Sequence, residues 1–307
     1  MNIAVIARIK TLHAAVRLQE EAIRQGHSLT IIEWGELHVE TNESETRIGT
    51  DTIDLSAFDV IIPRNDHYSS IRDGDPLSRS YSHIFDILPF FSSRRSIHFL
   101  NGTYFSSMRQ SGKLSQQVFL ADHGLPGIST CSLRYHLESS DIPFDYPVIL
   151  KDNIGSRGIG VFKVSSFEEA RRLVRERGDS GENMIAQQYY PINRDFRVIV
   201  VGDTAIGAIE RRSQDNEWRT NVSLGGKTSV VTDERLRKSL LQLGLRAAKA
   251  LSLEYAGVDI LEYDKELHII EINSLPQFEG FEKTLPDTNV ALSILRYIEA
   301  VRAEKYQ

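Results

Sequence analysis

The sequence predicts an α/β protein in which a doubly wound parallel sheet precedes a mixed α+β part. In the first third of the chain, short apolar runs alternate with amphipathic helical segments, which is typical of a parallel sheet covered by helices. After residue 113 the apolar runs become closely spaced and polar residues alternate with them, which indicates hairpin-connected strands. At 307 residues the chain is long enough for two or three domains, each with its own core.

The composition of the chain limits its possible partners and its cellular compartment. The chain is 41% hydrophobic and 25% charged, as globular proteins are, and its net charge of −6 comes without a basic arm, so no nucleic-acid partner is expected. The single Cys131 excludes a disulfide framework and fits a reducing compartment. The N-terminus has no basic n-region and no apolar run is long enough to span a membrane. We therefore expect a cytoplasmic protein without a membrane partner, and the sequence leaves homo-oligomer formation open.

The first third is expected to form a parallel sheet. Residues 3–7 read as a buried strand and residues 12–25 as an amphipathic helix that ends at Gly26. Further strands are expected at 29–33, 58–63 and 96–100, with a helix over 81–91. Ala-Arg-Ile-Lys stands at residues 7–10, where a dinucleotide-binding domain would begin its G-x-G-x-x-G. A dinucleotide cofactor and an NAD-dependent oxidoreductase are therefore disfavoured.

The remainder of the chain is expected to contain strands, turns and three helices. Ser166 and Glu169 form a plausible capping box for a helix after the glycine-rich loop, and Gly202-Asp203 reads as a hairpin turn. The other expected elements are a helix at 114–122 ending at Gly124, strands at 147–151 and 161–164, several strands within 184–230, and a helix at 233–251.

Residues 256–273 are the most informative stretch, because they predict a two-stranded platform. Apolar residues alternate there with Asp259, Glu271 and Asn273, so each strand has one apolar and one polar face. Residues 263–266 are polar and turn-like. An odd-length connection centred on Lys265 would place Asp259 opposite Glu271, whereas an even one would shift the register by one residue.

Converging carboxylates need a cation between them. Two like charges 4 Å apart repel by about 4 kcal/mol at an effective dielectric near 20. An all-oxygen site formed by Asp259, Glu271 and Asn273 suits Mg²⁺ held jointly with nucleotide phosphates. The alternative is an exposed acidic hairpin that binds nothing.

A glycine-rich loop follows Lys151. Glycines at 155, 158 and 160 let backbone N–H groups approach an anion, and the lysine adds a point charge suited to phosphate. The loop is not a P-loop. A ligand-free hairpin loop remains the alternative for this segment taken alone.

Arginines gather on the strands that follow. Asp195 and Arg197 share one face of a strand, Arg211 and Arg212 follow on the next, and Arg219 comes later. Guanidinium groups there could clamp a carboxylate or phosphate. For Arg211 a solvated, salt-bridged sheet face is the favoured interpretation. The histidines form no H-x-x-x-H pattern and no G-x-S-x-G is present, so zinc and acyl-enzyme chemistry are unsupported.

Taken in order, these segments resemble the ATP-grasp superfamily, and within it the RimK-like carboxylate–amine ligases, including ribosomal protein glutamate ligases. The resemblance runs collinearly from residue 2 to about residue 298. It is carried by Lys113, residues 147–151, 155–161, 187–190, 195–203, 208–212 with 218–221, and 256–273 continuing to 284.

The resemblance implies an N-terminal doubly wound pre-ATP-grasp domain (residues 1–100) followed by a two-subdomain α+β ATP-grasp module. The subdomains would span residues 101–185 and 186–307, the second carrying the metal site. ATP would be held by Lys113 and Lys151 at its phosphates, by the loop containing Gly155, Ser156, Gly158 and Gly160, and by Gln187, Gln188, Tyr189, Tyr190 and Asp195 around adenine and ribose. Asp259, Glu271 and Asn273 would carry Mg²⁺, with Mn²⁺ as an alternative, and Arg197, Arg219 and Asn221 would be the catalytic residues.

The implied reaction activates a carboxylate with ATP as an acylphosphate, which an amine attacks to give an amide, ADP and phosphate. The amine would belong to an amino acid or small amine, and the carboxylate to a protein C-terminus, a peptide or a metabolite. A non-catalytic ATP-binding regulatory protein of the same fold is the alternative. Three positions depart from the family pattern. Gln188 replaces a family glutamate at the adenine site, where it bears on nucleotide preference. On the substrate side, Ser223-Leu224 replace His-Arg, and Asn273-Ser-Leu-Pro-Gln277 replaces Asn-Ala-Ser-Pro-Gly.

Overall fold

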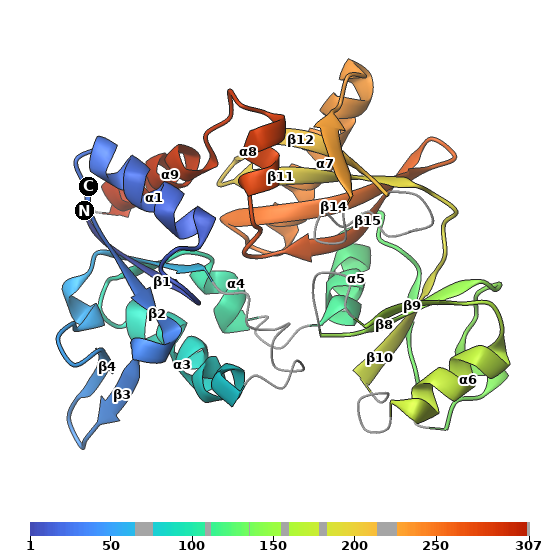
Figure 1. Cartoon of the computed structure of the whole chain (residues 1–307), viewed down its shortest axis with the longest axis horizontal. Helices are drawn as coiled ribbons and strands as arrows, with labels where there is room; N and C mark the ends of the chain where they lie inside the picture. Colours follow the sequence, from blue (N-terminus) through green and yellow to red (C-terminus); the bar gives the residue numbers. More distant parts are fainter. Residues whose placement is uncertain are drawn as a thin grey trace.

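The computed structural model describes residues 1–64, 76–107, 112–134, 136–154, 160–177, 183–213 and 226–305 (Figure 1). Its architecture is mixed α/β, with three larger sheets and flanking helices, as the sequence predicts. The predicted site residues Gly155, Ser156, Gly158, Arg219 and Asn221 lie outside the described residues, as do Ser223 and Leu224. None of the helices in the described part of the chain is long and apolar enough to span a bilayer.

The N-terminal sheet is parallel, with strand order β2-β1-β5-β6. Both faces of β1 (Asn2–Ala7) are buried, which explains its continuous apolar run. Helix α1 (His13–Arg24) and the C-terminal helix α9 (Val290–Lys305) pack on one face, and α3 (Pro76–Ser93) packs on the other (Figure 1). The remaining strands are β2 (Ser28–Glu33), β5 (Val60–Arg64) and β6 (His98–Phe99).

A second four-stranded sheet, ordered β7-β10-β8-β9, forms a small lobe with helix α6 (Phe167–Glu176). The predicted capping box forms in part, because Glu169 bonds the amide of Ser165 instead of that of Ser166. Ser166 Oγ accepts from the Glu169 amide at 3.3 Å, but the Glu169 carboxylate accepts from the amide of Ser165 at 2.7 Å. The strands are β7 (Thr130–Ser132), β8 (Val148–Asp152), β9 (Val161–Val164) and β10 (Met184–Gln188).

The central sheet is antiparallel, ordered β13-β12-β11-β14-β15. Helix α7 (Glu234–Ala250), whose first amides are capped by Asp233, covers one face, and the opposite face carries the charged residues described below. The predicted Gly202-Asp203 turn joins β11 to β12, with Gly202 at φ 55°. The strands are β11 (Arg194–Val201), β12 (Thr204–Arg212), β13 (Lys227–Val230), β14 (Tyr255–Tyr263) and β15 (Glu266–Asn273).

The hairpin β14–β15 reaches the predicted register by a different route. Its turn contains two residues, Asp264 and Lys265, both at positive φ (49° and 67°), so the connection is even in length, the case expected to shift the register by one residue. Asp259 nevertheless pairs with Glu271, because Ile260 pairs with Ile269 and Ile270 is an extra residue in a β-bulge. Without the bulge, Glu271 would project from the opposite face of the sheet.

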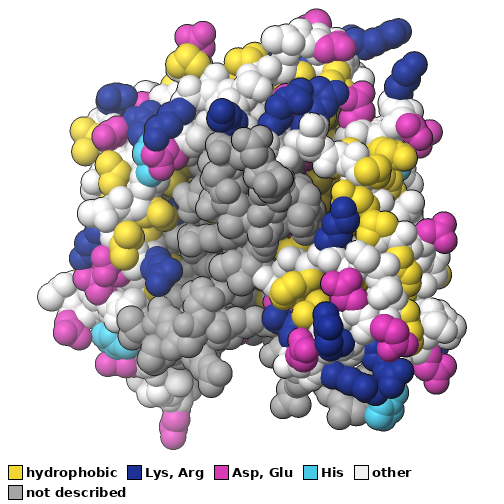
Figure 2. Space-filling model, turned by 45° about the vertical axis from the view of Figure 1, so that its right-hand side comes forward, with side chains coloured by type: hydrophobic (Ala, Val, Ile, Leu, Met, Phe, Trp, Pro, Cys, Tyr) yellow, Lys and Arg dark blue, Asp and Glu magenta, His cyan; other side chains and the backbone are white. Residues whose placement is uncertain are grey.

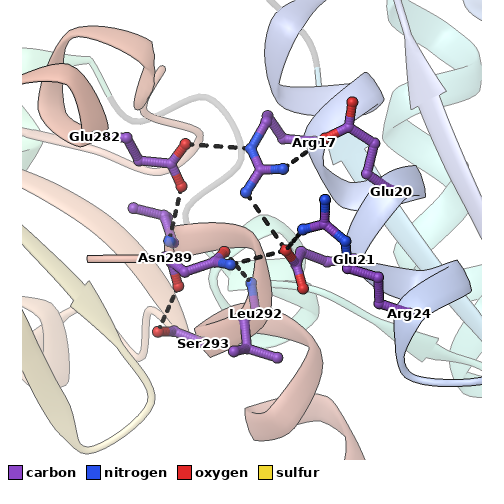
Figure 3. A network of polar contacts seen from close by, with 9 residues as sticks. Arg17, Glu20, Glu21, Arg24, Glu282, Asn289, Leu292 and Ser293 are labelled. Carbon is purple, nitrogen blue, oxygen red and sulfur yellow. Dashed lines mark hydrogen bonds and ion pairs between the residues drawn. The ribbon is translucent and has the colours of Figure 1, made fainter. Parts of the chain in front are cut away.

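Polar contacts fasten helix α1 of the N-terminal domain to α8 (Glu279–Thr284) and to the start of α9 (Figure 3). The Asn289 amide donates to Glu21 Oε1 at 2.8 Å, and Arg17 Nε lies 3.5 Å from Glu282. On the other side, buried Asn101 bonds four backbone groups of residues 254, 255 and 274. These contacts hold α1 in a fixed position beside the central sheet.

The remaining elements are shorter. They are strands β3 (His38–Thr41) and β4 (Thr46–Gly49), helices α4 (Gly102–Ser107), α5 (Lys113–Asp122) and α8 (Glu279–Thr284), and 3₁₀ turns at Trp34–Glu36, Leu55–Ala57 and Ser139–Asp141. On the face drawn in Figure 2, acidic and basic side chains are interspersed among the described residues.

Candidate active site

A ladder of charged side chains crosses one face of the central sheet. Asp195 pairs with Arg211 between β11 and β12, and Arg197 pairs with Asp259 between β11 and β14. Asp259 in turn pairs with Glu271 of the edge strand β15. Directly paired residues project from the same face, so these side chains converge although they come from four strands. The apolar residues between them point into the core under α7.

Asp259 is the centre of this ladder. Arg197 binds both of its carboxylate oxygens, with Nη2 at 2.8 Å from Oδ2, and Arg211 Nη2 lies 3.0 Å from Oδ1. The Asn273 amide nitrogen lies 3.5 Å from Oδ2. Burial opposes ionisation of Asp259, but Arg197 and Arg211 outweigh it and hold the pKa of this carboxyl below its ordinary value. The exposed acidic hairpin is therefore wrong, because Asp259 is 6% exposed.

Arg211 joins two acids. Its Nε and Nη2 each donate to Asp195 at 2.7 Å, and it also contacts Asp259. Burial disfavours its charge, yet the two carboxylates raise the pKa of Arg211 above its ordinary value. The predicted salt-bridged sheet face is thus correct in its ion pairs and wrong in its solvation, because Arg211 is 5% exposed.

Two buried lysines lie near the ladder, Lys151 on β8 of the small lobe and Lys113 at the start of α5, as predicted. Burial lowers the pKa of Lys151 to about 8; Glu271 and Asp259 oppose this change, while Lys113 adds to it. The structure therefore brings Lys151 close to Glu271 and Asp259, with Lys113 beside it.

The low pKa of Lys151 predicts a pH-dependent nucleotide affinity. Polyphosphate binds the protonated amine, so we expect the Kd for ADP to be constant below about pH 7.5 and to rise roughly tenfold per unit above pH 8. Calorimetric titration between pH 6.5 and 9.5 measures this. Lys151→Arg is the control, because its guanidinium keeps its charge and should remove the break. A wild-type Kd unchanged across pH 8 would contradict the prediction.

Two glutamines that sequence reasoning missed hold β15 in place. Gln116 of α5 bonds both the carbonyl and the amide of Ile272, at 2.9 and 3.1 Å. Gln117 donates to the carbonyl of the bulged Ile270 at 3.0 Å and accepts from the amide of Ile128. Together with the backbone pairing of Ile269 to residues 126–127, these side chains pair the outer edge of β15. No local signal marks them, because adjacent glutamines are ordinary on a helix surface.

Loss of this edge pairing should destabilise the fold. Gln117→Ala leaves buried backbone groups of β15 without partners, which costs about 1–3 kcal/mol of unfolding free energy. Val118→Ala is the matched control, because Val118 is exposed on the same helix. Urea unfolding measures both variants. Equal stability of the two would show that Gln117 contributes no net pairing energy.

The residues predicted to bind adenine and ribose lie in the described part of the chain, make separate contacts and form no single cluster like the charged ladder. Gln187 is buried and donates to Thr130 Oγ1 at 2.8 Å, whereas Gln188 is exposed. Tyr189 lies under the Lys163 ammonium, 4.0 Å from its ring centroid, and Tyr190 packs on the hairpin residue His268. Asp195 binds Arg211, as described above.

Gly160, the described glycine of the loop, has φ +70° and lies against Asp152. A Cβ there would come 2.0 Å from Asp152 Oδ2, so both the backbone conformation and the contact require glycine.

The donor set of the hairpin fits a hard cation. Asp259, Glu271 and Asn273 offer carboxylate and amide oxygens from two adjacent strands, the ligand type that Mg²⁺ prefers. Within the described ranges there is no cluster of three His, Cys, Asp or Glu that could hold a metal alone. A cation here would therefore rely on the Asn273 amide and on oxygens of a bound substrate.

Comparison with known proteins agrees with this geometry. Ribosomal protein bS6–L-glutamate ligase of Escherichia fergusonii is 28% identical over 306 residues, covering 97% of this chain and 96% of the relative. The protein of the same name from Escherichia coli O7:K1 is 28% identical over 312 residues, covering 100% and 98%.

Solved structures share the fold. The ATP-grasp ligase PsnB, in complex with a minimal precursor, has a TM-score of 0.70 at 18% identity, covering 98% of this chain and 99% of that one. The macrocyclase MdnC from Microcystis aeruginosa, bound with precursor peptide MdnA, has a TM-score of 0.70 at 17% identity, covering 98% and 100%. Another structure of PsnB contains Mg and ADP.

Family models match most of the chain. The RimK PreATP-grasp domain matches residues 1–73, and the RimK-like ATP-grasp domain matches residues 129–298, more than half of the sequence. The chain therefore belongs to the RimK-like family of ATP-grasp ligases.

Proposed function

We propose that this ligase joins the carboxylate of a peptide or protein to the amine of an amino acid, consuming ATP and releasing ADP and phosphate. The observation that carries the proposal is the convergence of two buried lysines with Asp259, Glu271 and Asn273 across the space between the small lobe and the central sheet. Cations on one side and oxygen ligands on the other suit a polyphosphate with its magnesium ion.

The residues divide the work of the reaction. Lys113 and Lys151 would hold the phosphates, and Asp259, Glu271 and Asn273 would hold Mg²⁺, which neutralises charge on the transferring phosphoryl group. A carboxylate oxygen of the acceptor attacks the γ-phosphorus and ADP departs. The amine then attacks the acyl carbon, phosphate departs, and the nitrogen loses a proton. Arg197 lies on the ladder beside Asp259, where its charge would orient the acyl group.

The substrate class follows from the relatives. The names of these relatives specify L-glutamate and a ribosomal protein, and two structural neighbours were solved with precursor peptides. An amino acid as the amine and a peptide or protein as the carboxylate are therefore the substrates we infer.

ADP release tests the proposal. The protein is incubated with ATP and Mg²⁺ across single amino acids, with and without short acidic peptides, and products are identified by mass spectrometry. We expect ADP release that depends on an amino acid, with an amide-linked product. Nucleotide binding without turnover in every mixture would instead favour an ATP-binding regulatory protein.

A further inference from the structure

The N-terminal sheet has a topological switch point between β1 and β5. From β1 the chain passes to β2 on one side, and it then crosses to β5 on the other side of β1. The last residues of the two strands, Ala7 and Arg64, are paired. In open α/β sheets, ligands bind outside the carboxyl ends of the strands at such a point. No residue of this edge takes part in the site described above.

Arg64 is buried at this edge with donors left over. Its side chain is 1% exposed, and Nη2 donates to the carbonyl of Pro276 at 2.8 Å. Nε and Nη1 have no hydrogen-bond partner, and the described residues supply no carboxylate to the guanidinium. Its planar group lies 5.5 Å from the ring centroid of Tyr255 and 5.6 Å from that of Phe278. A buried cation without an acid indicates a ligand that supplies one.

A second unpartnered group lies beside it. His13 is the first residue of α1, its buried Nδ1 has no partner, and its ring contacts Phe278 edge-on at 5.9 Å. Leu12 provides no side-chain cap, and the first turn of α1 contains no acid of its own; the nearby charge is that of Glu279 on α8, which acts on His13 from outside the helix. The contacts of Arg17 and Glu21 drawn in Figure 3 hold this helix against α8 and α9.

We propose that Arg64, His13 and the first turn of α1, called here the switch-point site, bind a non-reacting carboxylate of the amino-acid substrate. The inference rests on the proposed function and names where its amine substrate is held. A buried guanidinium suits a small free molecule, which can be enclosed completely, better than a large folded partner. Arg64 then supplies the charge and His13 an additional donor.

The position of the site agrees with the reaction. Tyr255, which contacts Arg64, and Asp259 lie on the same face of β14, four residues apart and so about 13 Å along the strand. A carboxylate held at one end of this span would lie on the same side of β14 as the amine and the acylphosphate at the other end. Gly257 lies between them, where a Cβ would come 2.7 Å from Pro276 and 3.2 Å from Arg197.

Steady-state kinetics of Arg64→Met test the inference, with L-glutamate as the probe and its two carboxamides, isoglutamine and glutamine, as analogues. We expect the KM for L-glutamate to rise at least tenfold while the KM for ATP changes less than twofold. Each analogue replaces one of the two carboxylates of glutamate by an amide. The analogue that loses the carboxylate bound by Arg64 should bind the wild type and the variant equally weakly. His13→Phe, which keeps the ring contact with Phe278, should raise the KM for L-glutamate about threefold.

Arg302→Met is the matched control, because Arg302 also joins separate elements, donating to the carbonyl of Asp59 at 2.6 Å, but lies outside the site. It should leave the KM for L-glutamate unchanged. Equal increases in both KM values for Arg64→Met would assign Arg64 a purely structural role and overturn the inference. If Arg64→Met fails to fold, the test passes to His13→Phe, and an unchanged KM for L-glutamate in His13→Phe would overturn the inference. Absence of amino-acid-dependent ADP release in wild type would instead overturn the proposed function itself.

Discussion

Glu271→Gln is expected to abolish ADP formation almost completely while leaving the protein folded. The substitution keeps the size of the side chain and removes the charge that faces Lys151 and pairs across the hairpin with Asp259. Loss of a preorganised charge at a phosphoryl-transfer site lowers kcat by about 10²–10³-fold. Glu271 is only partly buried, so the melting temperature should change by less than about 3 °C.

Asp259→Asn provides the comparison, because it should lose activity and stability together. Arg197 and Arg211 both bind Asp259, and removal of one partner from a buried ion pair costs about 3–5 kcal/mol. Coupled ADP-release assays and thermal unfolding on both variants separate the two effects. Wild-type turnover in Glu271→Gln would remove the argument for a cation site on the hairpin.

Lys151→Met should weaken nucleotide binding and at the same time stabilise the apo protein. Loss of a charge-assisted contact to phosphate, worth about 1.5–3 kcal/mol, raises the Kd for ADP roughly 10- to 100-fold. Burial lowers the pKa of Lys151 from 10.5 to about 8, so below pH 8 the folded state holds a charge that the unfolded state accommodates better. At about 1.4 kcal/mol per pKa unit, methionine should add about 3 kcal/mol of stability at pH 7.

The size of this stability change depends on pH, and its sign does not. Between pH 8 and 10.5 the folded protein releases the proton first, so the wild type gains stability and its difference from the variant shrinks. Lys238→Met, at an exposed position on helix α7 away from the site, is the control and should change neither quantity appreciably. A destabilised Lys151→Met at pH 7 would contradict the assignment of a strained, functional lysine.

Much of the fold, and the part of the site that lies on the β14–β15 hairpin, can be predicted from local sequence patterns. Alternation over residues 256–273 predicts that Asp259, Glu271 and Asn273 share a face, and Gly202 and Asp233 mark their turn and helix start correctly. Such signals are readable because side-chain direction repeats every two residues in a strand and every 3.6 in a helix. The order of the motifs likewise identifies the family, which the comparisons confirm.

What the sequence by itself determined is therefore which residues lie on which face of which strand, and the ligase family to which they belong. Only the tertiary structure decided that a bulge at Ile270 corrects the register of a two-residue turn, and that Arg197 and Arg211 share Asp259. It also decided that Gln116 and Gln117 complete an edge strand about 150 residues away, and that Arg64 is buried with free donors. The physical reason is that register, burial and ion pairing depend on neighbours distant in the chain, whereas periodicity depends only on adjacent residues.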